Sequence, residues 1–153
     1  MMELRTTFNI APSDHKITYG KPVMFIGSCF AGAVGAKLEA GRMPVMINPS
    51  GTVYNPVSVI NTLASAAEGR EYSEKDLLNY NGTWLSFDHY TDFSSTDRQE
   101  VLEKINLKIK EAAKLLSKAA FLFVTFGTAR VYRWNASGEI VSNCHKISDT
   151  RFT

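Results

Sequence analysis

The chain has 153 residues, 44% of them hydrophobic and 21% charged, which is an ordinary composition for one domain with a hydrophobic core. Its formal net charge of +2 is too small, and its lysines too interspersed with apolar residues, for a nucleic-acid-binding surface. No segment reaches the roughly 18 apolar residues that span a bilayer, and residues 1–9 lack the apolar core of a signal peptide. We therefore expect a cytoplasmic protein that binds neither nucleic acids nor membranes.

Two cysteines and three histidines are the candidate thiols and metal ligands. Cys29 and Cys144 are too few for a disulfide framework, so we expect free thiols in a reducing compartment. The histidines His15, His89 and His145 are scattered, and the neighbours Cys144 and His145 would point to opposite faces of a strand. The sequence therefore predicts no metal site, and we expect no cofactor.

The first part of the chain predicts a strand–helix–strand unit. After an irregular lead-in over residues 1–20, residues 22–26 form an apolar run typical of a strand buried on both faces. Apolar residues at helical spacing predict a helix over 30–40, and a second apolar strand follows over 44–47. Such a unit with short turns is typical of a parallel sheet.

The rest of the chain predicts two longer helices, a third strand and a hairpin. Asn55 and Pro56 are typical of a helix start, and Gly69 of its end. Residues 96–99 resemble a capping box, after which an apolar stripe predicts a helix to about residue 118. The other expected elements are a short helix over 73–78, a turn at 81–82, an aromatic segment over 84–90, a third buried strand over 121–126 and a hairpin of 131–134 with 139–142.

These elements predict an α/β fold in a single domain over residues 1–153. We expect a three-layer α/β/α sandwich, flavodoxin-like, with a short parallel sheet in the order 2-1-3 and a small β-hairpin. No helix is predicted after the third strand, so one flank of the sheet is left unpaired or uncovered. We therefore expect the domain to continue past residue 153, and we expect a homo-oligomer formed through the exposed sheet edge.

Three polar turns that contain glycine follow the three predicted strands. They are Gly27-Ser28-Cys29, residues 48–51 and residues 127–130. Because ligands of an open parallel sheet gather at the carboxyl ends of its strands, we expect these turns to meet at one site. The alternative is that a parallel sheet needs small turn residues for structural reasons alone.

The first of these turns carries the candidate nucleophiles. Ser28 and Cys29 lie between a buried strand and a helix start, where backbone amides and the helix dipole stabilise negative charge. Either side chain would suit a nucleophile, and the amides would hold an oxyanion. In the alternative interpretation Ser28 only caps the helix, and Cys29 is a small buried apolar residue.

Five blocks of sequence resemble the GSCFA family, in the same order along the chain. The eponymous block is Gly27-Ser28-Cys29-Phe30-Ala31, and the others are residues 48–56, 84–89, 125–129 and 143–146. The chain resembles the N-terminal portion of a GSCFA protein. That family is similar to the SGNH hydrolases of the GDSL type, so the resemblance implies an SGNH-like fold and acyl transfer on esters, often the deacetylation of sugars.

The resemblance also implies roles for individual residues. In register with the Gly-Asp-Ser turn of SGNH hydrolases, Cys29 takes the nucleophile position and Ser28 that of the aspartate. Either Cys29 attacks, or Ser28 acts one residue early, or hydrolysis has been lost. Gly51 matches the glycine whose amide contributes to the oxyanion hole in those enzymes.

The third turn and the general base depart from the SGNH pattern. Gly127-Thr128-Ala129 lacks the asparagine of the Gly-x-Asn block, so Thr128 or Asn143 would complete the oxyanion hole. No Asp-x-x-His occurs in the last third of the chain. His145 is the expected substitute base, and the alternative is that it faces the surface or a partner.

Two more side chains are candidates for substrate binding. His89, in the aromatic segment, either lines a substrate rim or is a partly buried, hydrogen-bonded structural histidine. Arg130 either binds a carboxylate or phosphate of the substrate or forms a surface salt bridge.

The predicted function is that of an SGNH-like acyl-ester hydrolase or acyltransferase acting on a small-molecule or carbohydrate ester, for example as a carbohydrate deacetylase. The missing C-terminal base leaves open that this chain is inactive. The alternatives are a non-catalytic module that binds a carbohydrate or acyl ligand, and a fragment of a longer enzyme.

Overall fold

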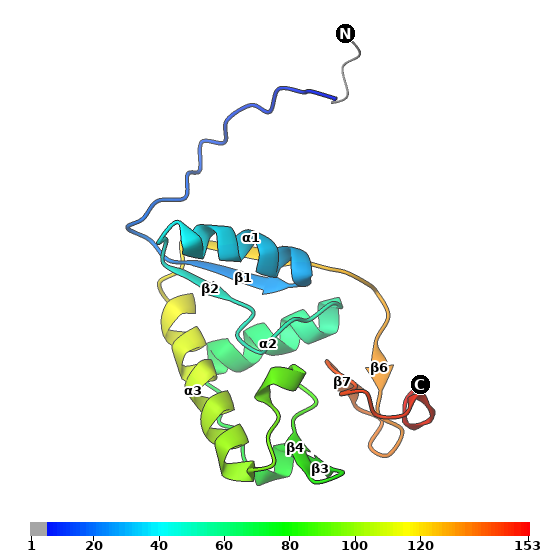
Figure 1. Ribbon diagram of the computed structural model, residues 1–153. Helices are drawn as coiled ribbons and strands as arrows, with labels where there is room; N and C mark the ends of the chain where they lie inside the picture. The colour runs from blue at the N-terminus through cyan, green and yellow to red at the C-terminus, as the bar shows by residue number, and fades with distance from the viewer. Residues whose placement is uncertain (1–5) are drawn as a thin grey trace.

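A computed structural model describes residues 6–153 and shows a mixed α/β fold around a short parallel sheet (Figure 1). β1 (Val23–Gly27), α1 (Cys29–Ala40) and β2 (Val45–Ile47) form the predicted strand–helix–strand unit. β5 (Phe121–Thr125) pairs with the other edge of β1, so the sheet has the order β2-β1-β5 with all strands parallel. The predicted strand order 2-1-3 is confirmed.

Helices cover both faces of this sheet and give three layers. α1 packs on one face, where Phe25 and Ala31 belong to one buried cluster. The helices α2 (Pro56–Glu68) and α3 (Arg98–Leu116) pack on the opposite face (Figure 1). There Met24 and Ile26 of β1 contribute to a second cluster together with Val59, Ala66 and Ala112. Because β1 is central, all five of its residues are buried.

The helix boundaries follow the sequence signals, with two differences. Asn55 caps α2 by accepting a hydrogen bond from the Ser58 amide at 2.9 Å, and Gly69 ends this helix in the left-handed conformation, as predicted. α1 begins one residue earlier than predicted, at Cys29. The predicted capping box over 96–99 is wrong, because Asp97 is the N-cap and accepts the amides of two residues that follow it.

Short elements join the helices and form two hairpins. The predicted hairpin of 131–134 with 139–142 is confirmed in a shorter form, and the turn at 81–82 joins a second hairpin that the sequence did not indicate. The predicted helix over 73–78 is a single 3₁₀ turn. The elements are η1 (Glu74–Asp76), β3 (Leu78–Tyr80), β4 (Thr83–Leu85), η2 (Thr91–Phe93), β6 (Tyr132–Arg133), β7 (Ile140–Val141) and η3 (Asp149–Arg151).

β5 differs from the buried strand that its apolar sequence predicts. Its residues alternate between half-buried and exposed, and Leu122 and Val124 are 42% and 37% exposed. These two side chains share the face of Met24 and Ile26, but they do not belong to the cluster that α2 and α3 form over β1. Within residues 6–153 the outer edge of β5 pairs with no strand. The predicted uncovered flank is therefore confirmed.

The lead-in predicted over residues 1–20 is irregular from Thr6 onward and extends away from the sheet (Figure 1). Residues 1–5, which belong to both this prediction and the signal-peptide prediction, lie outside the described residues. Over the described part of the chain, no helix combines the length and apolar character needed to cross a membrane.

Candidate functional site

The turn after β1 is held by both neighbouring strands. The Gly27 amide donates to Asn48 Oδ1 at 2.8 Å, in the turn after β2, and the Gly27 carbonyl accepts the Val53 amide at 3.0 Å. Gly27 has φ = 137°, and a Cβ atom built on it would lie 2.0 Å from the Thr125 carbonyl oxygen. Only glycine therefore fits this close approach of β1 and β5.

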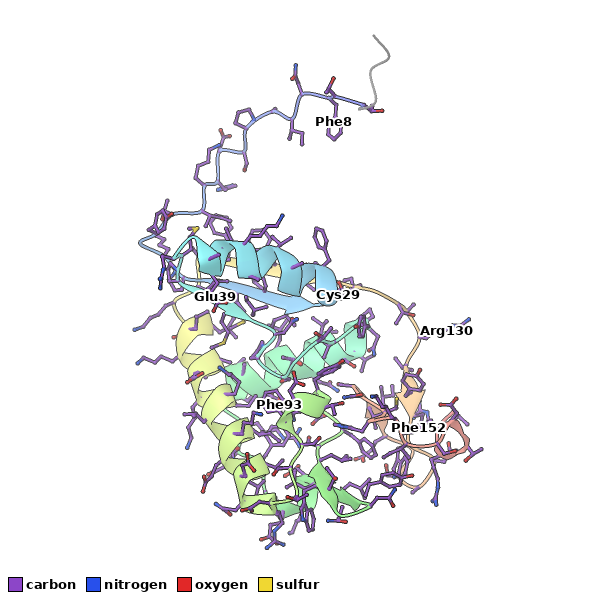
Figure 2. The ribbon with its side chains drawn as sticks, in the orientation of Figure 1. Phe8, Cys29, Glu39, Phe93, Arg130 and Phe152 are labelled. Carbon is purple, nitrogen blue, oxygen red and sulfur yellow. The ribbon has the colours of Figure 1, made fainter. Side chains whose placement is uncertain are left out.

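Ser28 and Cys29 point in different directions from this turn. The Ser28 side chain is 6% exposed, its hydroxyl lies 2.9 Å from Thr125 Oγ1, and its amide donates to the same oxygen at 3.0 Å. Ser28 occupies the N-cap position of α1 but does not cap it through its side chain. Cys29 is exposed and forms no disulfide with the described residues (Figure 2). The alternative interpretation is therefore correct that Ser28 is the N-cap residue, although its side chain forms no capping bond, and it is wrong that Cys29 is buried.

The start of α1 offers backbone donors beside the Cys29 thiol. The first N–H groups of a helix have no acceptor within the helix. Because the Ser28 hydroxyl is bonded to Thr125, it does not satisfy the N–H groups of Cys29 and the next two residues. No basic or acidic side chain belongs to the first turn of α1. The positive end of the helix dipole and these donors therefore lie beside a thiol.

Contacts with Tyr90 hold the turn after β2 in place. Gly51 has φ = 84°, and a Cβ atom there would lie 2.1 Å from the Tyr90 Cβ. The Tyr90 amide donates to the Ser50 carbonyl at 2.9 Å, which fastens the two segments together. The Gly51 amide donates to the Asn48 carbonyl at 2.7 Å, so in this arrangement it is occupied within its own turn.

The turn after β5 is fastened to the segment that precedes α2. The amides of Gly127 and Thr128 both donate to the Tyr54 carbonyl, at 2.8 and 3.1 Å. A Cβ atom on Gly127 would lie 2.8 Å from the Tyr54 ring and 3.6 Å from Ser28 Cβ, so this turn adjoins the first one. The three turns therefore lie side by side as predicted, and their forming one ligand site stays a prediction.

Two of the remaining candidates lie on the exposed part of the third turn. Thr128 Oγ1 accepts the amide of Arg130 at 3.0 Å, and its own hydroxyl hydrogen remains available for donation. Arg130 is exposed and forms no ion pair with residues 6–153. Figure 2 shows Arg130 on the segment that runs from β5 towards the C-terminal hairpin.

His89 is a buried histidine with one free ring nitrogen. Its side chain is 1% exposed, and Nδ1 lies 3.0 Å from Ser86 Oγ. Ser86 Oγ also accepts the Asp88 amide at 3.3 Å, so this hydroxyl links the His89 ring to the backbone of its own segment. Nε2 has no hydrogen-bond partner and lies among aromatic rings. Burial, reinforced by the charges of Arg70 and His145, lowers the pKa of His89 to about 3. This environment matches the structural interpretation and not a surface rim.

His145 and Asn143 fasten the C-terminal part of the chain to the segment around His89. His145 Nε2 lies 2.8 Å from the Ser86 carbonyl, to which it donates, and Nδ1 lies 3.5 Å from Ser94 Oγ. Asn143 Nδ2 donates to the His89 carbonyl at 3.4 Å, and Asn143 Oδ1 accepts the His145 amide. Burial lowers the pKa of His145, although hydrogen bonds to the backbone act in the opposite direction.

These contacts place His145 in an aromatic cluster apart from the thiol. The His145 ring centre lies 6.3 Å from that of Phe87, which in turn lies 6.1 Å from that of Phe152. Figure 2 shows Phe152 in the C-terminal part of the molecule and Cys29 at the end of the sheet. None of the hydrogen bonds of His145 reaches the turns around Cys29.

Two residues of the site have roles that the sequence did not indicate. Thr125 is the last residue of β5 and holds Ser28, and the Asn48 side chain holds Gly27. Both are polar residues at the carboxyl end of an apolar strand. This position is the one feature of the sequence that could have indicated a role for them in the site. Among residues 6–153, no three His, Cys, Asp or Glu side chains gather as a metal site would require.

The comparison with protein families agrees with the motif at this turn. The family model described as "GSCFA family" matches residues 22–153, which is most of the chain. The protein therefore belongs to the GSCFA family, as the five sequence blocks predicted. No curated protein and no solved structure matches the chain.

Proposed function

We propose that the protein is an acyl-ester hydrolase or acyltransferase and that Cys29 is its nucleophile. The observation that carries this proposal is the contrast within the turn, where the Cys29 thiol is exposed while the Ser28 hydroxyl is bonded to Thr125. The amides at the start of α1 lie beside the thiol and suit the stabilisation of an oxyanion. The expected resemblance to SGNH hydrolases supports the same chemistry at the same turn.

The proposed reaction has two acyl-transfer steps. The Cys29 thiol loses its proton to water, and Sγ forms a bond to the carbonyl carbon of the ester while the carbonyl electron pair moves to oxygen. Collapse of this intermediate breaks the ester C–O bond, releases the alcohol, which takes up a proton, and leaves the acyl group on Sγ as a thioester. Water, or an acceptor alcohol, then attacks the carbonyl carbon of the thioester, the C–S bond breaks, and Sγ takes up a proton, which gives a carboxylic acid or a new ester and restores the Cys29 thiol.

Esterase assays with p-nitrophenyl acetate and butyrate test the proposal. We expect Cys29→Ala to reduce turnover to the background rate. Cys144→Ala removes the other thiol, and its turnover should stay within about threefold of that of the original chain. The acyl-enzyme should be detected by mass spectrometry on the peptide that contains Cys29. Absence of turnover by the unmodified chain contradicts the proposal. Loss of activity in Ser28→Ala with full activity in Cys29→Ala would assign the nucleophile to Ser28.

The same assay tests the expected role of His145. Its Nε2 donates to the Ser86 carbonyl, and its ring belongs to the cluster around Phe87. The proposed chemistry therefore passes the thiol proton to water, and we expect His145→Gln to change kcat by less than about tenfold. A loss of the hundredfold or more that is typical of a removed general base would restore His145 as the base.

A non-catalytic binding module is the second candidate. It is favoured by the amides of Gly51, Gly127 and Thr128, which are occupied by hydrogen bonds within the chain and so are withheld from an oxyanion. Under this alternative, no ester in the assay is hydrolysed, and Cys29→Ala leaves ligand binding unchanged. Both candidates are compatible with the cytoplasmic location that we propose from the two free cysteines.

A further inference from the structure

A cavity of about 610 Å³ lies away from the Cys29 turn, between two parts of the chain. One wall is formed by α2, the residues that follow it and β3, and the other by the β6–β7 hairpin. Phe87 and Asp88 also line the cavity. We call this cavity the hairpin cleft. Its volume falls in the range of sites that bind small organic ligands.

The charges that line the hairpin cleft cancel. Three basic and three acidic side chains contribute to its walls, so the cleft has no net charge. A binding site for a polyphosphate would carry an excess of basic groups, and a site for an organic cation would carry an excess of acidic ones. The charge balance therefore favours a neutral ligand. The six side chains are Arg70, Lys75, Asp76, Asp88, Arg133 and Glu139.

Some of these charged groups neutralise one another, and others are left without an ion pair, although Arg133 donates to the Gly138 carbonyl and Glu139 accepts from the Ser137 hydroxyl. Arg70 pairs with Asp76 at 2.7 Å and with Asp88 at 3.4 Å. Lys75, Arg133 and Glu139 form no ion pair with the described residues. Lys75 offers donors from one wall, and the hairpin wall offers donors from Arg133 and an acceptor from the Glu139 carboxylate, so the cleft presents both kinds of hydrogen-bonding group.

An aromatic surface lies beside these polar groups. The Trp134 ring centre lies 5.0 Å from that of Phe87 and 5.1 Å from that of Phe152, so the indole is fixed by its neighbours. Both Trp134 and Phe87 contribute to the wall of the cleft. A rigid ring gives a large apolar contact at little cost in side-chain entropy.

We propose that the hairpin cleft binds a neutral saccharide. Sugar hydroxyls are both donors and acceptors, which matches the Lys75 and Arg133 donors and the Glu139 acceptor that line the cleft, and the C–H face of a pyranose matches the indole ring. This site is separate from the ester chemistry proposed for Cys29, and the inference does not depend on it. In one respect the two are connected, because Asp88 lies two residues before Tyr90, whose amide donates to the Ser50 carbonyl in the turn after β2.

An NMR titration of the full chain tests this inference, with maltotriose, cellotriose, xylotriose and chitotriose as probes. The indole N–H signals of Trp134 and Trp84 are distinguished by the Trp84→Phe variant. We expect at least one trisaccharide to shift the Trp134 signal in a saturable manner and to leave that of Trp84, which lies outside the cleft, unchanged. If no probe at millimolar concentration shifts Trp134, or if a probe shifts only residues around Cys29, the inference is overturned.

Two carboxylate variants and one anionic probe complete the test. Glu139→Ala should weaken saccharide binding about tenfold or more, because it removes a charged hydrogen-bond acceptor. Glu103→Ala, which makes the same charge change on exposed α3, should leave the affinity unchanged. Equal affinities in the two variants would overturn the inference. Inorganic triphosphate that binds more tightly than every saccharide would also overturn it, since the cleft would then select charge.

Discussion

The hydroxyl of Ser28 lies 2.9 Å from the hydroxyl of Thr125, and that same Thr125 oxygen accepts the Ser28 amide at 3.0 Å. One side chain at the end of β5 thereby fixes both the backbone and the side chain of the residue that follows β1. Because Ser28 is turned inward by this pair of bonds, Cys29 is the outermost reactive group of the turn. The geometry of the candidate nucleophile therefore depends on a residue of another strand.

Replacement of Thr125 by valine tests this dependence. Valine retains the shape of threonine but cannot accept the Ser28 amide or bond its hydroxyl, so two buried polar groups lose a partner. We expect a loss of about 1–3 kcal/mol in the free energy of unfolding, measured by urea denaturation. Thr128→Val is the control, since Thr128 is exposed and its hydroxyl accepts one exposed amide. Equal effects of the two substitutions would show that Thr125 does not hold the turn.

The close approach of Gly51 and Tyr90 gives a second prediction. Gly51→Ala and Gly82→Ala both place alanine at a positive φ, of 84° and 79° respectively, and both should therefore incur a similar backbone strain. Only Gly51→Ala also forces a Cβ atom to 2.1 Å from Tyr90 Cβ, whereas Gly82 has open space around it. We expect Gly51→Ala to be the more destabilising by about 2 kcal/mol or more in thermal denaturation. A similar melting temperature for the two variants would contradict the proposed steric contact.

The sequence predicts the central part of the fold because its signals there are local. An apolar run that ends at Gly27, a helix that starts directly after it and the Asn55-Pro56 start of α2 each depend on neighbouring residues. The burial of β5 could not be predicted in this way. Residues 121–126 are as apolar as residues 22–26. However, β1 is the central strand and β5 lies at the edge, so the two strands differ in burial because helices cover β1 more fully than β5.

The candidate site was predictable in position and not in its contacts. Chain topology brings the three turns together, since the carboxyl ends of parallel strands share one edge of a sheet. The partner of Ser28 is 97 positions away, and the carbonyl that His145 binds is 59 positions away. No local pattern indicates such pairings. For the same reason the sequence left the direction of the Ser28 side chain open, and this direction is what favours Cys29.

The buried His89 gives a prediction for the pH dependence of stability. Its pKa is about 3 in the folded protein and about 6.5 in an unfolded chain, so between these values the unfolded state binds the additional proton. The stabilisation is fully present above about pH 6.5 and is lost as the pH falls towards 3. Since each unit of pKa difference corresponds to about 1.4 kcal/mol, we expect a loss of a few kcal/mol. Urea denaturation between pH 7 and pH 4 measures it.

A comparison of two histidine variants assigns this effect to His89. Asp76 and His145 also have lowered pKa values, so part of the acid sensitivity should remain in any single variant. His89→Phe removes the buried titrating group. As the pH falls below 6.5, the free energy of unfolding of this variant should decrease less steeply than that of the original chain. His15→Phe, at an exposed position, should retain the original slope. If the slope is unchanged in His89→Phe, protonation of His89 does not limit acid stability.

The uncovered face of β5 gives a prediction for self-association. Leu122 and Val124 are exposed on the face that α2 and α3 cover elsewhere, and the outer edge of β5 has no partner strand within residues 6–153. An edge of this kind is a template for pairing with another chain. We propose that two copies associate through β5, which would add a second β5 to the sheet and remove these side chains from water. Light scattering at micromolar concentration should then give a mass above that of the monomer.

Charge at this edge distinguishes β5 pairing from other modes of association. Val124→Lys introduces a charge that a second β5 would have to bury, and it should return the protein to the monomer. Leu107→Lys makes the same type of change at a 61% exposed position of α3 and should leave the association unaffected. Because both positions are exposed, neither substitution should cost more than about 0.5 kcal/mol in the monomer. A monomer for the original chain, or a dimer that persists in Val124→Lys, would exclude β5 as the interface.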